Sequence, residues 1–564
     1  MTSEDAPWWT RAVVYQVYPR SFADSDGDGM GDLPGVLSRL DHLADLGVDV
    51  LWLSPVYRSP QHDNGYDISD YRDVDPVFGT LADLDELIAA LHARGMKLLM
   101  DLVVNHTSDQ HAWFTASRSS RDDPKRDWYW WRPARPGTVP GTPGAEPNDW
   151  GSFFSGPAWT YDEASGEYFL HLFTRQQPDL NWENPDVRAA VHEMMRWWLD
   201  RGVDGFRMDV INMISKDPAL PDGRPRRASG FADGTPHFLS GPRIHEFLQE
   251  THREVFAGRD GLLTIGEMPG ATVEQAVRYT DPARDELDMV FQFEHVGIDH
   301  GSSKWDVQPF DLVRLKRSLG RWQAGLADRG WNSLYWDNHD QPRVVSRFGD
   351  DGAHRVRSAK ALATALHLHR GTPFVYQGEE LGMANAPWSG IEDFRDVETV
   401  NHWADAVQGG AEPERVLDAL RAMSRDNART PVQWDSSAHA GFTSGTPWLP
   451  VHPDADRVNV AVQRDDPGSV LAHYRRLIAL RHDEPVVALG DFTMLLPEHP
   501  QVYAFLRRLD DVELLVLANL SGEDVEVDVP AGWDGAPVLL DDGRVSSRVG
   551  LLEPWESRVH RRSA

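Results

Sequence analysis

Four apolar segments of one type decide the fold of this chain: KLLMDLVVNH (residues 97–106), GFRMDV (205–210), LLTIGEM (262–268) and LYWDNHD (334–340). Each has the length of a β-strand and ends in polar or charged residues. Near-continuous apolar runs are typical of strands in parallel sheets, which are buried on both faces. In closed parallel barrels the chemistry sits at the carboxyl ends of the strands, where these polar residues fall.

Four further runs of the same kind complete a set of eight. They are AVVYQVY (12–18), VDVLWLS (48–54), MVFQFE (289–294) and TPFVYQGEE (372–380). Helix-length amphipathic stretches separate most of the eight runs, and this alternation is typical of βα units. The sequence therefore predicts an α/β fold, a (β/α)8 TIM barrel made of residues 1–106 and 172–484.

Two segments break the alternation and predict additional domains. Residues 107–171 are rich in Pro, Gly, Trp and Asp and are too long for a simple βα loop, so we expect a small inserted domain over the active site after the third strand. Residues 485–564 contain short strand-like runs separated by turn residues. They predict a C-terminal antiparallel β-domain, specifically a β-sandwich.

The composition narrows the possible partners. With 88 acidic and 56 basic residues the net charge is −32, which disfavours binding to nucleic acid and to anionic membranes. We find no apolar run of about 18 residues and no basic, apolar leader at the N-terminus, and expect a cytoplasmic protein. The absence of Cys excludes thiolate nucleophiles and thiolate metal sites. We expect no organic cofactor.

The strand ends carry the groups needed for glycoside cleavage. Cleavage with retention needs two carboxyl groups about 5 Å apart, one attacking the anomeric carbon and one protonating the leaving oxygen. Asp209 and Glu267 end consecutive predicted strands, and neighbouring strands lie about 4.8 Å apart. Arg207 shares the strand face of Asp209, and Asp340 ends a later strand. Each acid alone could simply cap the next helix; their shared position favours a catalytic site.

These motifs resemble the α-amylase superfamily, glycoside hydrolase family 13. DLVVNH, GFRMDV, GEM and NHD occur in the family's order, and QPDLNWENP (from Gln177) matches a further family motif, so that the resemblance covers nearly the whole chain. HDNGYDISDY, YQGEELGM and SRDNARTPVQWD are similar to the oligo-1,6-glucosidase and α-glucosidase branch. The resemblance implies that Asp209 is the nucleophile and Glu267 the general acid/base. It also implies that Asp340 clamps the hydroxyls of the distorted sugar.

The resemblance also implies the walls of the substrate pocket. Tyr66, His106, Arg207 and His339, with Phe173 and Gln177, are expected to line the −1 subsite. Asp63 and Arg425 resemble the pair that closes the non-reducing end of the pocket. Val210 follows the nucleophile, at a position that tends to be Val in members of the branch that prefer α-1,6 bonds.

A loop after the first predicted strand resembles a cation site. The side chains of Asp24, Asp26, Asp28 and Asp32 and the Met30 carbonyl follow the ligand spacing of a calcium loop, without its final bidentate Glu. The pattern alone is also that of an Asp/Gly-rich turn. The resemblance implies a structural Ca²⁺ site, for which Mg²⁺ could compete.

The predicted function is a retaining, exo-acting α-glucosidase that releases glucose from the ends of short α-glucoside oligosaccharides, with α-1,6 bonds favoured over α-1,4 bonds or sucrose. Two alternatives stay open: a sucrose or maltose isomerase or transglucosidase of the same fold, and a trehalose-6-phosphate hydrolase. A catalytically inactive protein like transporter heavy chains is disfavoured by the intact Asp209, Glu267 and Asp340.

Overall fold

The core of the molecule is a closed parallel barrel. The computed structural model describes residues 6–225, 230–542 and 548–563; the remaining parts of the predicted barrel and C-terminal domain lie outside the described residues. The barrel strands are β1 (Val14–Val17), β2 (Val50–Leu53), β5 (Lys97–Val103), β9 (Gly205–Asp209), β10 (Leu263–Glu267), β11 (Met289–Phe291), β12 (Ser333–Leu334) and β13 (Thr372–Tyr376).

All eight predicted strands pair in parallel, which confirms the predicted fold class. The eight strands follow the order β11-β10-β9-β5-β2-β1-β13-β12, and a parallel bridge between Val290 and Asn332 joins the two ends. The register aligns Ile265 with Arg207 and Gly266 with Met208. Continued by one residue, this register places Glu267 beside Asp209 at the carboxyl end of the barrel.

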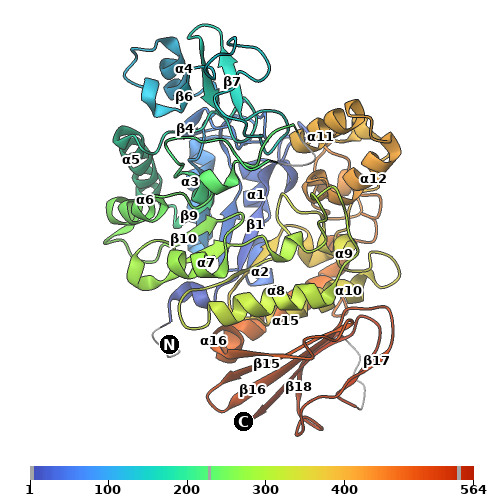
Figure 1. The fold of residues 1–564 in the computed structure, drawn as a ribbon. Helices are drawn as coiled ribbons and strands as arrows, with labels where there is room; N and C mark the ends of the chain where they lie inside the picture. Colours follow the sequence, from blue (N-terminus) through green and yellow to red (C-terminus); the bar gives the residue numbers. More distant parts are fainter. Residues whose placement is uncertain (1–5, 226–229, 543–547, 564) are drawn as a thin grey trace.

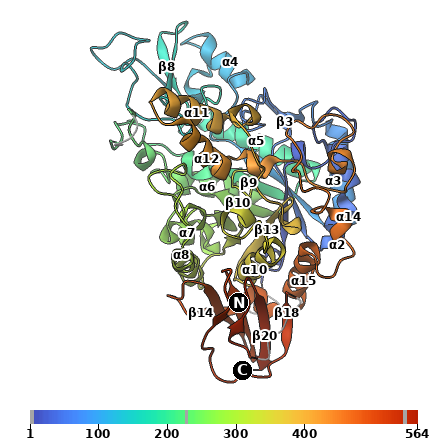
Figure 2. The ribbon, with the colours of Figure 1, turned by 90° about the vertical axis from the view of Figure 1, so that its right-hand side faces the viewer.

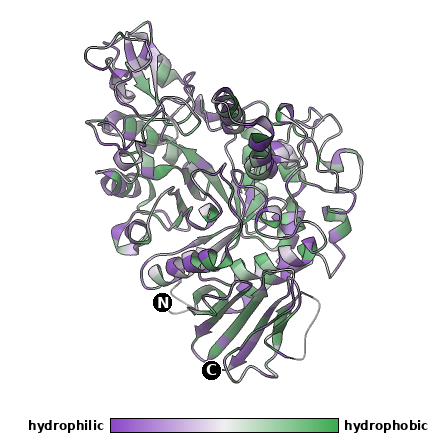
Figure 3. Ribbon diagram, turned by 45° about the vertical axis from the view of Figure 1, so that its right-hand side comes forward, coloured by the Kyte–Doolittle hydropathy of each residue, from purple (hydrophilic) through white to green (hydrophobic). Residues whose placement is uncertain are grey.

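Amphipathic helices surround the barrel (Figure 1). They include α3 (Leu81–Ala93), α5 (Pro185–Arg201), α7 (Val273–Thr280), α8 (Leu312–Gly325), α10 (Arg355–His367) and α15 (Val470–Asp483). The sequence sets the ends of α5: Asn184 caps its first turn, and Gly202 ends it with a φ of 112°. Colouring by hydropathy shows apolar strands inside and polar outer helix faces (Figure 3). In the described residues, no helix is both long and apolar enough to cross a bilayer.

The segment after β5 forms a small three-stranded sheet above the carboxyl end of the barrel (Figure 1). It contains α4 (Ala112–Ser119), β6 (Trp131–Arg132), β7 (Trp159–Asp162) and β8 (Glu167–Leu170), in the order β6-β8-β7. Its buried aromatic residues, among them Trp130, Trp150 and Trp159, form one apolar cluster with Val210 and Met213, which follow β9 in the chain. This shared core fixes the inserted segment above the carboxyl end of the barrel.

An antiparallel sheet covers the opposite end of the barrel, next to α10 and α15 (Figure 2). Its strands are, in order, β14 (Asp491–Leu495), β15 (Val502–Leu509), β16 (Val512–Asn519), β20 (Ser557–Ser563) and β18 (Val538–Asp541). A second, two-stranded sheet consists of β17 (Val525–Glu526) and β19 (Leu551–Leu552). Lys316 of α8 reaches across and donates to the carbonyls of His499 and Val502 at 2.6 and 3.0 Å. The C-terminal sheet therefore supports the barrel far from the inserted segment.

Buried histidines make stability sensitive to acid. Burial lowers the pKa of His106 and His295 to about 4 and that of His339, His367 and His369 to about 3. The unfolded chain therefore binds protons below about pH 6.5 that the folded chain does not, and each histidine costs up to about 1.4 kcal/mol per pH unit below that point.

We expect the melting temperature to fall steeply between about pH 6.5 and the folded pKa values. Neither ring nitrogen of His367 has a hydrogen-bond partner among the described residues. His367→Met should therefore flatten the fall, which differential scanning calorimetry would measure. If the melting temperature of this variant falls with pH as steeply as that of the wild type, His367 does not contribute to the acid sensitivity.

Candidate active site

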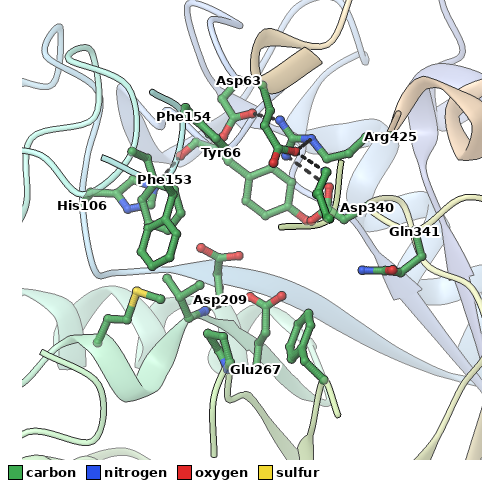
Figure 4. A pocket seen from close by; sticks show the side chains of 17 residues that line it. Asp63, Tyr66, His106, Phe153, Phe154, Asp209, Glu267, Asp340, Gln341 and Arg425 are labelled. Atoms are coloured by element: carbon green, nitrogen blue, oxygen red, sulfur yellow. Dashed lines mark hydrogen bonds and ion pairs between the residues drawn. The ribbon is translucent and has the colours of Figure 1, made fainter. Parts of the chain in front are cut away.

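The predicted site residues converge on one cavity of about 220 Å³ at the carboxyl end of the barrel. Figure 4 shows Asp209 and Glu267 on one side of the cavity, with Asp63, Asp340 and Arg425 on the other. The predicted residues that line it are Asp63, Tyr66, His106, Phe173, Asp209, Val210, Glu267, Asp340 and Arg425. Arg207, Gln177 and His339 lie just behind this surface and hold lining residues in place.

Arg207 organises the two central carboxylates. Its Nη1 donates to Asp209 at 2.8 Å and to Asp101 at 2.9 Å, and its Nη2 contacts Glu267 Oε1 at 2.7 Å. The Arg207 side chain is only 1% exposed, so these bonds form away from water and are strong. One guanidinium therefore orients both acids, which come from adjacent strands.

The two acids lie close enough for Glu267 to affect the protonation of Asp209. Burial, and then the charge of Glu267, raises the pKa of Asp209 well above its ordinary value, although Arg207 opposes the shift. The Glu267 charge therefore disfavours ionisation of Asp209, and the Arg207 guanidinium offsets part of that cost.

The residue after Asp209 has a strained backbone that serves the other acid. Val210 adopts left-handed angles, φ 35° and ψ 40°, which β-branched residues rarely adopt and which cost about 1–3 kcal/mol. In this conformation its N–H donates to Glu267 Oε2 at 2.9 Å. The strain therefore aims a backbone donor at Glu267 and turns the Val210 side chain into the cavity.

Asp340 lies across the cavity and is held ionised. Burial alone would raise its pKa, but contacts with His339, Arg425 and Arg429 lower it far below the ordinary value. Because burial lowers the pKa of His339 to about 3, that ring is neutral, and the two arginines supply the positive charge. His339 also stacks on Tyr66, with ring centroids 5.1 Å apart.

Asp63 and Arg425 close one end of the cavity. Arg425 Nη2 donates to Asp63 at 3.2 Å, and Gln177 donates to the other Asp63 oxygen at 3.0 Å. Burial raises the pKa of Asp63 to about 6, although Arg425 opposes the shift. Arg425 also contacts Asp340 at 3.2 Å and Asp396 at 2.6 Å. The predicted pair is thus part of a larger buried charge network.

Aromatic rings form the wall beneath the inserted segment. Phe173 packs on His106 at 5.1 Å and on Phe153 and Phe154 at 5.4 and 5.5 Å. Phe154 also lies under the Arg425 guanidinium at 4.8 Å. Such faces suit the C–H surface of a pyranose ring.

Several residues of the site were not predicted from the sequence. Asp101 binds Arg207 and also accepts a hydrogen bond from the Tyr66 hydroxyl at 3.0 Å. In the sequence, its position as an acid inside an apolar strand could have pointed to this role. Lys304 and Glu398 form an ion pair in the wall of the cavity, which Gln341 and Phe293 also line. Arg429, in the matched SRDNARTP motif, binds Asp340 at 2.8 Å. Nothing local in the sequence points to Asp396.

The predicted cation loop lies outside this cavity. Asp24, Asp26 and Asp28 present carboxylate oxygens within 4.8 Å of one another. Asp32 caps α1 (Leu33–Ser38) through the Gly35 N–H at 2.6 Å, and its other oxygen accepts from the Ser25 N–H at 2.9 Å. The Met30 N–H donates to Asp28 at 2.7 Å. These oxygens are the donor type that Ca²⁺ prefers.

Comparison with known proteins agrees with this geometry. Residues 16–490 match the model of the α-amylase catalytic domain, and residues 492–545 match the maltogenic amylase C-terminal domain. An oligo-1,6-glucosidase of Parageobacillus thermoglucosidasius is 52% identical, with 98% of this chain and 99% of the relative covered.

Proteins that carry other names are also similar to this chain in sequence and structure. A trehalose-6-phosphate hydrolase of Bacillus subtilis (strain 168) is 46% identical over 100% of this chain and 99% of its own. A solved trehalulose synthase superposes with a TM-score of 0.94 at 43% identity, covering 99% of this chain and 100% of the other. The family motifs, the barrel and its paired acids lead to one conclusion: this chain belongs to the α-amylase family and is a glycoside hydrolase.

Proposed function

We propose that the protein is a retaining, exo-acting α-glucosidase that removes terminal glucose from short α-glucosides, α-1,6-linked ones above all. The observation that carries this proposal is the pair Asp209 and Glu267 on one guanidinium, inside a cavity closed by Asp63 and Arg425. The name of the 52% identical relative supports the linkage.

The reaction follows from the placement of the acids. In the reactive form Asp209 is ionised and attacks the anomeric carbon, while Glu267 gives its proton to the departing oxygen. The glucosyl group is then bound to Asp209 as an ester. Glu267, now ionised, takes a proton from water, which attacks the same carbon and frees Asp209. Asp340 stays ionised throughout and can accept hydrogen bonds from the sugar hydroxyls.

The charge of the cavity favours a neutral substrate. Five acidic residues line it, while its two cations, Lys304 and Arg425, are already paired with carboxylates. A sugar phosphate would meet net repulsion there, which disfavours trehalose-6-phosphate hydrolysis. For the isomerase alternative, isomaltulose synthases carry an Arg-Leu-Asp-Arg-Asp loop shortly after the NHD motif, where this chain has SRFGD (346–350) instead. Its Arg347 ends α9 (Val344–Arg347) and pairs with Asp299 at 2.6 Å.

Product analysis on isomaltose, maltose, sucrose, trehalose, trehalose 6-phosphate and panose tests the proposal. We expect glucose as the first product from isomaltose and panose, with retained anomeric configuration by NMR. Isomerised disaccharides as the main product from sucrose, or hydrolysis of trehalose 6-phosphate alone, would each overturn it.

Val210 should set the linkage preference. Its side chain lines the cavity next to the acids, and a β-branched residue there crowds a directly attached 4-linked ring more than a 6-linked one. Val210→Ala should therefore raise kcat/KM on maltose relative to isomaltose by about 10- to 100-fold, the scale of packing discrimination of ~1–3 kcal/mol. Met213→Leu, a cavity-lining change of similar volume, serves as the control. A wild-type enzyme that strongly prefers maltose would contradict this role.

We also propose that Asp24, Asp26, Asp28, Asp32 and the Met30 carbonyl hold one structural Ca²⁺. The clustered carboxylates repel one another without a cation. Asp24 also accepts a hydrogen bond from Thr443, so the ion would fasten two distant loops. Ca²⁺ at 100 times its Kd should add about 2.7 kcal/mol to the free energy of unfolding and raise the melting temperature.

The control for the cation site is the double variant Asp26→Asn with Asp28→Asn. Its melting temperature should change neither with added Ca²⁺ nor with EDTA. Mg²⁺ should compete weakly, since this loop offers few rigid octahedral positions. Identical melting curves of the wild type in EDTA and in excess Ca²⁺ would rule the site out.

A further inference from the structure

A second cavity, of about 420 Å³, lies on the outer side of the molecule between α5, β4 (Asp70–Val74) and the start of the inserted segment. Figure 1 shows α4, β4 and α5 along the same edge. The cavity shares no lining residue with the active site. Its volume is within the range of about 300–1,000 Å³ that is usual for small-molecule sites.

Aromatic side chains form the inner wall of this outer cavity. Trp113 packs edge-on against Trp128 at 5.0 Å and against His111 at 4.5 Å, and it lies 5.8 Å from Tyr71. Among the described residues, neither the Trp113 nor the Trp128 indole N–H donates to a protein acceptor. Such amphipathic rings with free donors are a common lining of carbohydrate sites.

His111 adds a donor to the wall of the cavity, and the geometry determines its protonation. Its Nδ1 accepts the Trp113 backbone N–H at 3.0 Å and so carries no proton. Burial lowers its pKa to about 4, so the ring is neutral and its proton is on Nε2. The residue is 5% exposed and lines the cavity, and in the described chain no protein acceptor bonds to Nε2. This donor faces the cavity and can bond water or a ligand there.

The rim of the outer cavity is charged but balanced. Asp70 and Glu193 supply two carboxylates, and Arg72 and Lys125 supply two cations. Arg72 pairs with Glu193 at 2.9 Å, and the Lys125 ammonium lies 3.3 Å from the centroid of Trp128. Balanced charge gives no attraction for an anion or a cation as such. A neutral ligand rich in hydroxyls can use both the acceptors and the donors.

We propose that this outer cavity is a second carbohydrate site, which holds a neutral α-glucan chain away from the active site. The α-linkage of this glucan rests on the proposed function. The aromatic wall and the polar rim are the observations that support carbohydrate binding in the cavity. A polymer or long oligosaccharide held on α5 and the inserted segment would keep its chain ends concentrated near the enzyme.

Affinity electrophoresis in native gels with soluble dextran tests the site. Dextran offers few chain ends for a closed pocket but many internal units for an outer site. We expect the wild type to be retarded relative to a non-binding reference protein. Trp113→Phe, and separately Asp70→Ala with Lys125→Ala, should weaken the apparent Kd about five- to tenfold, the scale of one stacking or hydrogen-bond contact.

Trp197→Phe is the matched control, since Trp197 is also a half-buried tryptophan, lies on α5 under Arg201 and lines no cavity described here. It should leave the retardation unchanged. All variants should keep the wild-type kcat/KM on isomaltose, and the double variant changes only rim residues, so it tests the site even if Trp113→Phe fails to fold.

The outer site is overturned if wild-type mobility is unaffected by dextran, or if retardation persists equally in the folded rim and aromatic variants. Failure of the proposed function gives a different result, because the wild type would then hydrolyse no short α-glucoside whatever its mobility in the gels.

Discussion

Asp209→Asn should abolish hydrolysis of every α-glucoside, with kcat falling by on the order of 10⁴-fold or more, as for other groups that form the covalent intermediate. The amide is nearly the same size and can still contact Arg207, which holds Asp209 at 2.8 Å. It cannot, however, supply the electron pair that attacks the anomeric carbon. Initial rates on isomaltose and on a p-nitrophenyl α-glucoside would measure the loss.

Glu267→Gln is the matched control, because it makes the same chemical change to the acid on the adjacent strand. A p-nitrophenyl leaving group needs no proton, so this variant should retain part of the first step on the activated substrate and almost none on isomaltose. Removing the Glu267 charge should also bring the pKa of Asp209 down, since that charge helps to raise it. Substantial turnover by Asp209→Asn on either substrate would show that another group is the nucleophile.

Truncating the closed end of the pocket should give the second large effect. In Asp63→Ala with Arg425→Ala, a terminal glucose loses two charged partners worth about 1.5–3 kcal/mol each. We therefore expect kcat/KM on isomaltose to fall by about 10²- to 10⁴-fold. Arg429 still binds Asp340 at 2.8 Å and Asp396 at 3.3 Å, so these acids keep a cation and the double variant should fold.

Arg425→Ala alone is an instructive comparison. It leaves Asp63 buried without its cation, a change that typically destabilises a protein by about 3–5 kcal/mol. We expect this single variant to be less stable than the double variant, as measured by chemical denaturation.

For the wild type, the closed pocket predicts that glucose is the first product from short chains and that polymers react slowly. Early release of longer fragments from within a polymer would contradict the exo-acting mode.

The barrel and its central acids could be predicted from the sequence because both depend on local patterns. A strand buried on both faces must be apolar along its length, so each of the eight strands is visible in its own few residues. The carboxyl ends of parallel strands meet at one rim, so Asp209, Glu267 and Asp340 could be brought together without knowing any side-chain contact. The cation loop is likewise a local spacing, and its occupancy stays a prediction.

The rest of the site was decided by contacts between side chains far apart in the chain. Arg425 reaches Asp63 across 362 positions, and Arg207 reaches Asp101 across 106. The left-handed backbone of Val210 is held by its surroundings against the preference of a β-branched residue, so propensity would predict the opposite. Such contacts depend on how loops and helices pack, which no local periodicity records. For this reason the reaction class could be inferred from the sequence, and the pair Asp63 and Arg425 from its resemblance to the family, whereas the links of Arg425 to Asp340 and Asp396 and the outer aromatic cavity appeared only in the tertiary structure.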